Sequence, residues 1–220
     1  MRIAILGGTF DPIHNGHIAA ARSVSSAFCT DEVHFVPAYS APHKQSREST
    51  SPFHRFAMVA LGVLPFEGFR ASAIEVDALE KRYTVDTLDA MRTTYPDSQF
   101  VFVMGTDMYQ DFETWKDYRR LFNLAHLAIV HRPGFVFRTD LAPHRVVKDG
   151  EKVTLPEKPA VFYLPFVEQP VSSTSLREAC RKGADVREWL PAPVWNYIER
   201  NKLYSDERLR MQARGRSHQD

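Results

Sequence analysis

The sequence predicts an α/β domain built on a doubly wound, mostly parallel sheet, with a small C-terminal helical part. Short apolar runs alternate with segments of helical periodicity along most of the 220 residues. This alternation is typical of a parallel sheet that is covered by helices on both faces. A glycine-rich turn also follows the first apolar run, at the carboxyl end of a strand, where ligands bind in such sheets.

The apolar runs give the expected strands, at residues 3–6, 33–36, 70–76, 100–104, 127–130 and 161–166. Periodic apolar positions give the expected helices, at 16–27, 52–63, 84–95, 175–182 and 194–201. Ser51 precedes Pro52 and is placed to cap the second helix, while Gly183 is placed to end the fourth.

The remaining segments are polar. Residues 38–51 are expected to form a long loop, and residues 134–160 an insertion or a lid over the core. We therefore expect one domain over 1–205, followed by a charged, flexible tail over 206–220.

Composition excludes several classes of protein. Lys and Arg number 28 against 27 Asp and Glu, which gives a net charge of +1 and no broad basic field for nucleic acid. No apolar run is long enough for a signal peptide or a membrane span. Cys29 and Cys180 are far apart and form no CxxC motif, which favours two reduced thiols in a cytoplasmic protein. The oligomeric state stays open.

The opening segment GGTFDPIHNGH, residues 7–17, has the features of a phosphate site. Gly7 and Gly8 allow a phosphate to approach the backbone, and the next helix points its N-terminal amides at the same place. His14 and His17 are three residues apart, so they can share one face of that helix and donate hydrogen bonds to phosphoryl oxygens.

Other interpretations of this segment remain open from the residues alone. A glycine-rich turn can be purely structural, and two histidines can be half of a metal site. The dinucleotide fingerprint GxGxxG and the P-loop GxxxxGK[ST] are both absent.

The segment resembles the GGTFDPxHxGH opening of bacterial nicotinate mononucleotide adenylyltransferases, members of the nucleotidyltransferases that carry an HxGH signature. The resemblance extends to about Tyr204 and includes APHK (41–44), HRFAMV (54–59), YTVDTL (83–88), MGTDMYQDFETW (104–115), HRPGF (131–135), SSTSLR (172–177) and YIERNKLY (197–204). It implies a Rossmann-like fold. It also implies adenylyl transfer from ATP to nicotinate mononucleotide, which gives deamido-NAD and pyrophosphate in NAD biosynthesis.

The resemblance also implies roles for individual residues. The catalytic residues would be His14 and His17. ATP would be bound by Gly8, Thr9, Phe10, Gly105, Asp107, Ser173, Thr174 and Arg177. The mononucleotide would be bound by Lys44, Thr84, Trp115 and Arg132. We expect Mg²⁺ to be held mainly by the ATP phosphates and water, with no metal ligand from the protein.

Simpler roles are also open for several of these residues. Asp107 could be a helix cap, Trp115 a core aromatic residue, and Arg132 and Arg177 solvated surface arginines. Two features depart from the family. Lys116 follows Trp115 where relatives often have Tyr, and the segment 138–159 is longer than expected.

Three other functions compete with this one. A relative could adenylylate nicotinamide mononucleotide or 4'-phosphopantetheine instead. The fold could also serve a nucleotide-binding regulator, which the presence of both histidines and Arg177 disfavours. A nicotinamide-dependent oxidoreductase would need the missing glycine fingerprint.

Overall fold

The centre of the protein is a seven-stranded sheet, seen in a computed structural model that describes residues 1–40, 50–165 and 171–205. The strands are β1 (Arg2–Gly8), β2 (Glu32–Pro37), β3 (Phe69–Ala71), β4 (Gln99–Gly105), β5 (His126–Val130), β6 (His144–Val146) and β7 (Val161–Leu164). Their order is β3-β2-β1-β4-β5-β7-β6, and every paired set of strands runs parallel. The predicted parallel sheet is confirmed.

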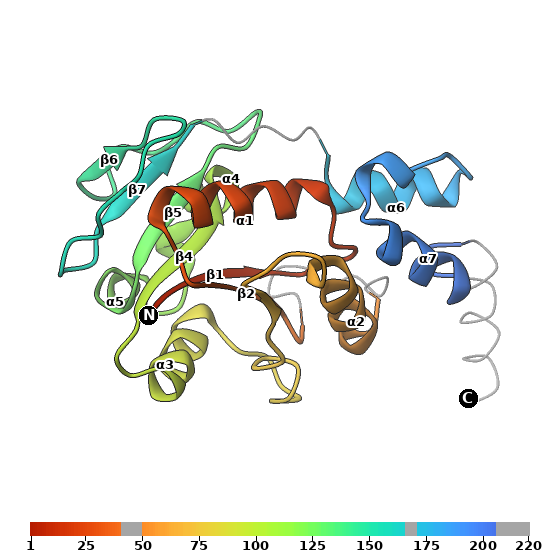
Figure 1. The fold of residues 1–220 in the computed structure, drawn as a ribbon, viewed down its shortest axis with the longest axis horizontal. Helices are drawn as coiled ribbons and strands as arrows, with labels where there is room; N and C mark the ends of the chain where they lie inside the picture. The colour runs from red at the N-terminus through yellow and green to blue at the C-terminus, as the bar shows by residue number, and fades with distance from the viewer. Residues whose placement is uncertain (41–49, 166–170, 206–220) are drawn as a thin grey trace.

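Helices cover both faces of this sheet, because its strands are apolar on both sides. In β1, Ala4 and Leu6 belong to one core cluster, and Ile3 and Ile5 to the other. The first cluster includes side chains from α1 (Asn15–Phe28), α2 (Pro52–Val63), α6 (Ser173–Arg181) and α7 (Ala192–Arg200). The second includes side chains from α3 (Thr84–Thr94), α4 (Thr106–Gln110) and α5 (Tyr118–Leu124). Figure 1 shows α1 and α3 on opposite sides of the sheet.

The strand order reverses between β1 and β4. From β1, strands β2 and β3 follow in order toward one edge of the sheet. The next strand, β4, pairs with the other side of β1. Connections leave β1 and β4 toward opposite faces at this point, which opens a crevice at the carboxyl ends of the strands. The glycine-rich turn after β1 lies at this position.

The C-terminal part is helical, as predicted. Val194 and Ile198 of α7 are buried, and α7 packs against α2. Gly62 of α2 makes this approach possible, because a Cβ atom there would lie 3.1 Å from a methyl carbon of Val194. Gly183 has a φ of +71° directly after Lys182, the C-cap of α6, which confirms its predicted place at the end of that helix. The expected tail, 206–220, lies outside the described residues.

Several predicted boundaries were wrong. The strand expected at 70–76 is only Phe69–Ala71, and residues 74–79 form turns. Ile74 and Val76 are apolar because they pack into the core from a turn. The strand expected at 161–166 ends at Leu164, and Phe166 lies outside the described residues. Ser51 is the N-cap position of α2, but its side chain makes no capping hydrogen bond.

The region between β4 and β5 contains short helices that the sequence did not predict. They are α4, the 3-10 helix η1 (Phe112–Thr114) and α5, with five, three and seven residues. Such short helices give no complete apolar stripe, so periodicity cannot detect them. A second 3-10 helix, η2 (Arg187–Trp189), was missed for the same reason.

The long segment 134–160 packs on the edge of the sheet. It contains β6, which pairs with β7, and its Val147, Val153 and Leu155 are buried. The Phe137 ring stacks on Tyr163 with the two ring centres 4.3 Å apart, and on Tyr109 at 5.4 Å. The segment therefore extends the core at this edge of the sheet.

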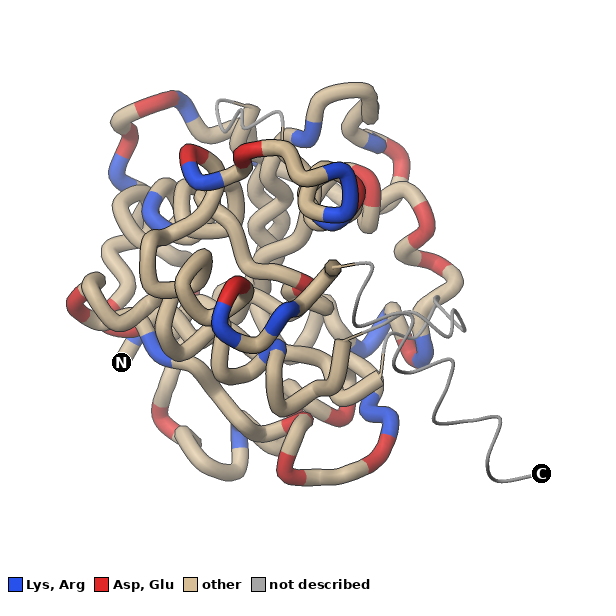
Figure 2. Tube along the Cα trace, turned by 90° about the vertical axis from the view of Figure 1, so that its right-hand side faces the viewer, with Lys and Arg blue, Asp and Glu red and all other residues tan. Residues whose placement is uncertain are grey.

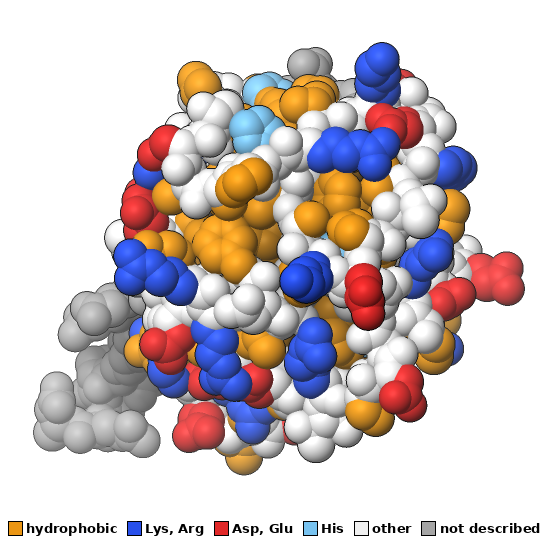
Figure 3. Space-filling model, turned by 90° about the vertical axis from the view of Figure 1, so that its left-hand side faces the viewer, with side chains coloured by type: hydrophobic (Ala, Val, Ile, Leu, Met, Phe, Trp, Pro, Cys, Tyr) orange, Lys and Arg blue, Asp and Glu red, His pale blue; other side chains and the backbone are white. Residues whose placement is uncertain are grey.

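Charged residues of both signs are mixed along the described trace (Figure 2) and over the face at the β6 and β7 end (Figure 3). Both cysteines are free thiols. No helix in the described ranges has the length and apolar character needed to cross a membrane.

Candidate active site

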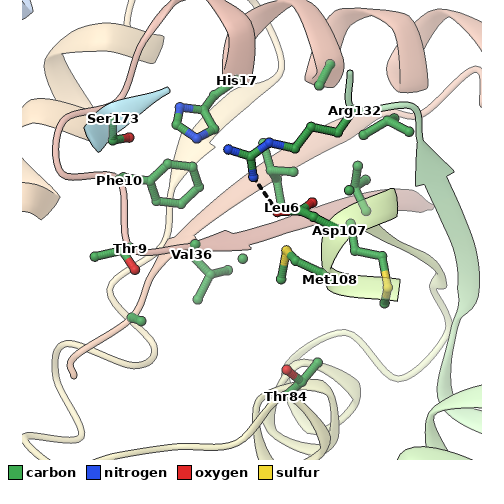
Figure 4. A pocket seen from close by; sticks show the side chains of 18 of the residues that line it. Leu6, Thr9, Phe10, His17, Val36, Thr84, Asp107, Met108, Arg132 and Ser173 are labelled. Atoms are coloured by element: carbon green, nitrogen blue, oxygen red, sulfur yellow. Dashed lines mark hydrogen bonds and ion pairs between the residues drawn. The ribbon is translucent and has the colours of Figure 1, made fainter. Parts of the chain in front are cut away.

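A cavity of about 620 Å³ lies at the carboxyl ends of β1, β2, β4 and β5. Its size is in the usual range for small-molecule sites. All of the predicted site residues within the described part of the chain line it: Gly8, Thr9, Phe10, His14, His17, Thr84, Gly105, Asp107, Trp115, Arg132, Ser173, Thr174 and Arg177. Lys44 lies outside the described residues. Figure 4 shows several of these side chains converging on one space.

The signature loop, which we define as residues 9–14 between β1 and α1, turns sharply into the cavity. Gly8 stands at its start, where a Cβ atom would make a tight contact of 3.1 Å with the Phe10 ring. Phe10 itself is in the left-handed region with a φ of +48°, an uncommon conformation for a residue with a side chain.

His14 and His17 lie together, as predicted. Their rings stack with centres 3.7 Å apart, at the first turn of α1. The backbone N–H of His14 donates to Nδ1 of His17 at 3.2 Å. A neutral His17 ring must then carry its hydrogen on Nε2, so this nitrogen is a donor. Nδ1 of His14 is buried and has no hydrogen-bond partner among the described residues.

Both histidines are held in the neutral form by their surroundings. Burial lowers the pKa of His14 from 6.5 to about 4, and the nearby Arg132 charge adds to this effect. Burial also lowers the pKa of His17 well below 6.5, with further contributions from His14 and Arg132. An anion between these groups would favour their charged forms and reverse the shift.

Asp107 and Arg132 form an ion pair across the cavity (Figure 4). Asp107 belongs to α4, directly after β4, and Arg132 follows β5, so the parallel strands bring them together. Gly105 leaves room beside them, because a Cβ atom there would overlap Asp107 Oδ1 and displace that carboxylate. That oxygen is buried without a hydrogen-bond partner among the described residues, so it can accept a bond from a ligand.

Helix α6 presents its N-terminus to the same cavity. It begins at Ser173, two residues before the predicted start, and Ser172 is its cap, whose Oγ accepts from the backbone N–H of Ser175 at 3.1 Å. Ser173 Oγ donates to the carbonyl of Pro12 at 2.9 Å, and Arg177 Nη1 donates to the carbonyl of Asp11 at 2.7 Å. This helix therefore binds the signature loop as well as lining the cavity.

The far end of the cavity lies between the start of α3 and the segment after η1. Thr84 is the first residue of α3. The half-buried Trp115 packs edge to face on Phe102, with ring centres 6.3 Å apart, and still lines the cavity. Lys116 pairs with Asp86 at 3.0 Å, so it is held at the rim.

Three buried residues that support the site were not singled out from the sequence. Arg55 is 1% exposed and donates to the carbonyls of Thr9 (2.7 Å), Tyr39 (3.0 Å) and Thr50 (3.0 Å). Asp11 accepts from the hydroxyl group of Tyr204 at 2.7 Å. All three lie within the motifs quoted above. The signal that could have identified them is that each is a polar residue with an apolar neighbour in the sequence.

In the described ranges 1–40, 50–165 and 171–205, no group of three or more His, Cys, Asp or Glu side chains could hold a metal ion.

Comparison with known proteins defines the class. Residues 5–179 match the cytidylyltransferase-like family, which makes this chain a nucleotidyltransferase. The chain is 36% identical to a probable nicotinate-nucleotide adenylyltransferase of Geobacter metallireducens, over 94% of this chain and 100% of the relative. It is 36% identical to one of Tropheryma whipplei, over 90% and 97%. The chain belongs to the nicotinate-nucleotide adenylyltransferase family.

A solved structure supports the fold. Plasmodium falciparum nicotinic acid mononucleotide adenylyltransferase, complexed with NaAD, superposes with a TM-score of 0.73 at 20% identity, and the match covers 92% of this chain and 97% of that one.

Proposed function

We propose that this protein transfers the adenylyl group of ATP to nicotinate mononucleotide, giving deamido-NAD and pyrophosphate in NAD biosynthesis. The observation that carries the proposal is one cavity with two chemically different ends. One end has the His14–His17 pair and the N-termini of α1 and α6. The other has Trp115 and the N-terminus of α3.

The reaction needs no strong general base. The attacking atom is a phosphate oxygen of the mononucleotide, which is already anionic at neutral pH. It attacks the α-phosphorus of ATP, the bond to the β-phosphate oxygen breaks, and pyrophosphate leaves with that electron pair. Positioning and charge stabilisation can therefore supply most of the catalysis.

The residues of the first end suit this task. Nε2 of His17 is a fixed donor, because Nδ1 already accepts from the backbone of His14. Arg177 is held by Asp11 beside the α6 N-terminus, where backbone amides favour anions. We assign the ATP phosphates to these groups and the ribose to Asp107, whose Oδ1 is buried without a partner in the described part of the chain.

Arg132 is assigned to the phosphate of the mononucleotide. In the ion pair with Asp107, its charge is compensated before substrates arrive. A phosphate that enters between them would take over part of this pairing and leave Asp107 for ribose hydroxyl groups.

The second end favours an acid over an amide. Trp115 can stack on either pyridine ring, so stacking alone does not discriminate. Backbone N–H groups at the start of α3 can donate hydrogen bonds to a carboxylate, whereas the NH₂ of an amide group there would place a donor against a donor. We therefore infer a preference for nicotinate over nicotinamide mononucleotide.

Mg²⁺ and a cytoplasmic location complete the proposal. The phosphate end offers cationic and neutral donors and one unpartnered carboxylate oxygen of Asp107, which fits an ion that arrives on ATP. The ion would neutralise charge on the triphosphate and on the leaving pyrophosphate. Two free thiols are in keeping with a reducing compartment.

A substrate panel tests the function. Pyrophosphate release is measured with ATP and, separately, nicotinate mononucleotide, nicotinamide mononucleotide and 4'-phosphopantetheine, each with and without a chelator. We expect the highest kcat/KM with nicotinate mononucleotide and loss of activity in the chelator. Release with phosphopantetheine alone, or full activity in the chelator, would refute the proposal.

A further inference from the structure

Glu75 is a buried carboxyl group in the wall of the cavity, and the mechanism above gives it no task. It follows β3 in the turn segment 74–79 and is 9% exposed. It lines the cavity together with Thr84 and Thr87 of α3. A carboxyl group is seldom buried unless it is paired, so its position needs an explanation.

Only one of its oxygens is bound. The hydroxyl group of Thr87 donates to Glu75 Oε1 at 2.7 Å. Thr87 lies one helical turn after Thr84, which places Glu75 against the first turns of α3. Oε2 has no hydrogen-bond donor among the described residues, so it is available to a ligand in the cavity.

The charges around Glu75 only partly compensate its burial. Arg55 approaches from α2 and Arg82 from the segment before α3. Burial dominates and raises the pKa of Glu75 from 4.5 to about 6, against the opposing effects of these arginines and the Thr87 hydrogen bond.

The two lysines at the rim of the cavity, Lys81 and Lys116, already have partners. Lys116 pairs with Asp86, and its ammonium group lies over the Tyr83 ring, 5.0 Å from the ring centre. Lys81 lies over the same ring at 4.7 Å. The carboxylate of an acid substrate at the start of α3 would therefore lie on the same wall of the cavity as Glu75, a buried group of its own sign, and Arg82.

We propose that Glu75 is a specificity-determining residue that makes the preference for the acid over the amide mononucleotide depend on pH. This inference rests on the proposed function, because it assumes that the pyridine ring binds near Thr84 and Trp115. The carboxylate of the acid substrate would lie at the start of α3, and Glu75 is bonded to Thr87 in the same helix. The acid therefore binds best when Glu75 is protonated, and Oε2–H can then donate to it. The amide carries no charge and binds either form.

The direction of the effect follows from proton linkage. Binding of the acid to ionised Glu75 takes up one proton from solvent, so its affinity falls as pH rises above the pKa of about 6. The acid-to-amide ratio of kcat/KM should fall by up to about tenfold per pH unit above this value. Protons taken up by His14 or His17 cancel in the ratio, because both substrates bring the same phosphate group.

The test compares both mononucleotides from about pH 5.5 to about pH 8.5. The variants are Glu75→Gln and a matched control, Glu80→Gln, which removes the same charge from an exposed position directly after the turn segment. We expect the ratio to fall with pH in the wild type and in Glu80→Gln. In Glu75→Gln it should be flat, and at the alkaline end about tenfold or more above wild type.

A second measurement needs no variant. Calorimetry of mononucleotide binding to the wild type, in buffers of different ionisation heat near pH 7.5, should give more proton uptake for the acid than for the amide. A flat wild-type ratio, or equal proton uptake, overturns the role of Glu75 while both mononucleotides are still adenylylated. If neither mononucleotide is adenylylated at any pH, the proposed function fails and this inference fails with it.

Discussion

The hydroxyl group of Tyr204 donates to Oδ1 of Asp11 at 2.7 Å, across 193 positions of the sequence. Asp11 is 3% exposed and its other oxygen accepts from the backbone N–H of Thr50 at 3.2 Å. Together with Arg55 and Arg177, these contacts fix the backbone of the signature loop from several sides. The C-terminal helical part therefore helps to set the position of the two histidines.

Removal of this hydroxyl group should affect both stability and turnover. In Tyr204→Phe, a buried carboxylate loses a donor, which costs about 1–3 kcal/mol of unfolding free energy. We expect kcat to fall about tenfold to hundredfold, because small displacements of catalytic groups are costly. Urea unfolding and steady-state kinetics measure the two effects.

The control is Tyr197→Phe, which removes a hydroxyl group bonded to His54 at 2.8 Å, on α7 and outside the cavity. This variant should lose stability without a comparable loss of kcat. If both variants reduce kcat equally, the Asp11 contact has no special role.

Much of the fold could be predicted because it depends on local patterns. The alternation of Ile3, Ala4, Ile5 and Leu6 between two core clusters already defines a strand that is covered on both faces. The predicted strand boundaries were wrong where apolar residues are buried by tertiary packing and not by a strand, as at Ile74 and Val76. The strand β6 within the insertion also had no signal, because His144, Arg145 and Val146 form a short edge strand with little apolar content.

The residues that line the cavity could be predicted from the sequence, but the buried contacts that hold them in place could not. Residues at strand ends and helix starts converge in any parallel sheet, so His14, Asp107 and Ser173 could be placed together. The contacts of Arg55 with three carbonyl groups depend on how distant loops meet, which no spacing in the sequence encodes. The Asp107–Arg132 pair was likewise not foreseen, since each residue was assigned to a different substrate.

His17→Ala should reduce kcat far more than it changes KM. The ring has one hydrogen on Nε2 and a fixed orientation, and loss of one such donor to transition-state charge costs roughly 10²–10³ in rate. The comparison is with His144→Ala, a histidine of β6 outside the cavity. A His17→Ala enzyme with nearly wild-type kcat would show that the donor is dispensable.

Protein stability should fall in acid partly because of His14. Its pKa is 6.5 in the unfolded chain and about 4 in the folded protein, so the folded state binds fewer protons between these values. The stability is fully present above pH 6.5 and is lost as pH falls toward about 4, up to about 3 kcal/mol.

Urea unfolding of the wild type and of His14→Asn, at several pH values in this window, measures the contribution of His14. The variant should show a shallower dependence of unfolding free energy on pH. Parallel curves for the two proteins would mean that His14 is not held neutral by its surroundings.

Trp115→Ala should weaken both mononucleotides and leave most of the preference for the acid. Loss of aromatic stacking on a base costs about 1–3 kcal/mol, and it affects both rings in the same way. KM for each mononucleotide should therefore rise about tenfold or more. If the acid-to-amide ratio of kcat/KM collapses instead, Trp115 takes part in recognition of the carboxylate.

The most direct test of adenylyl transfer follows two radioactive phosphorus atoms of ATP in separate reactions with nicotinate mononucleotide. Label in the α-phosphate should appear in deamido-NAD, and label in the γ-phosphate should appear in pyrophosphate. Transfer of the γ-label to the mononucleotide, or hydrolysis of ATP without any dinucleotide, would contradict the account.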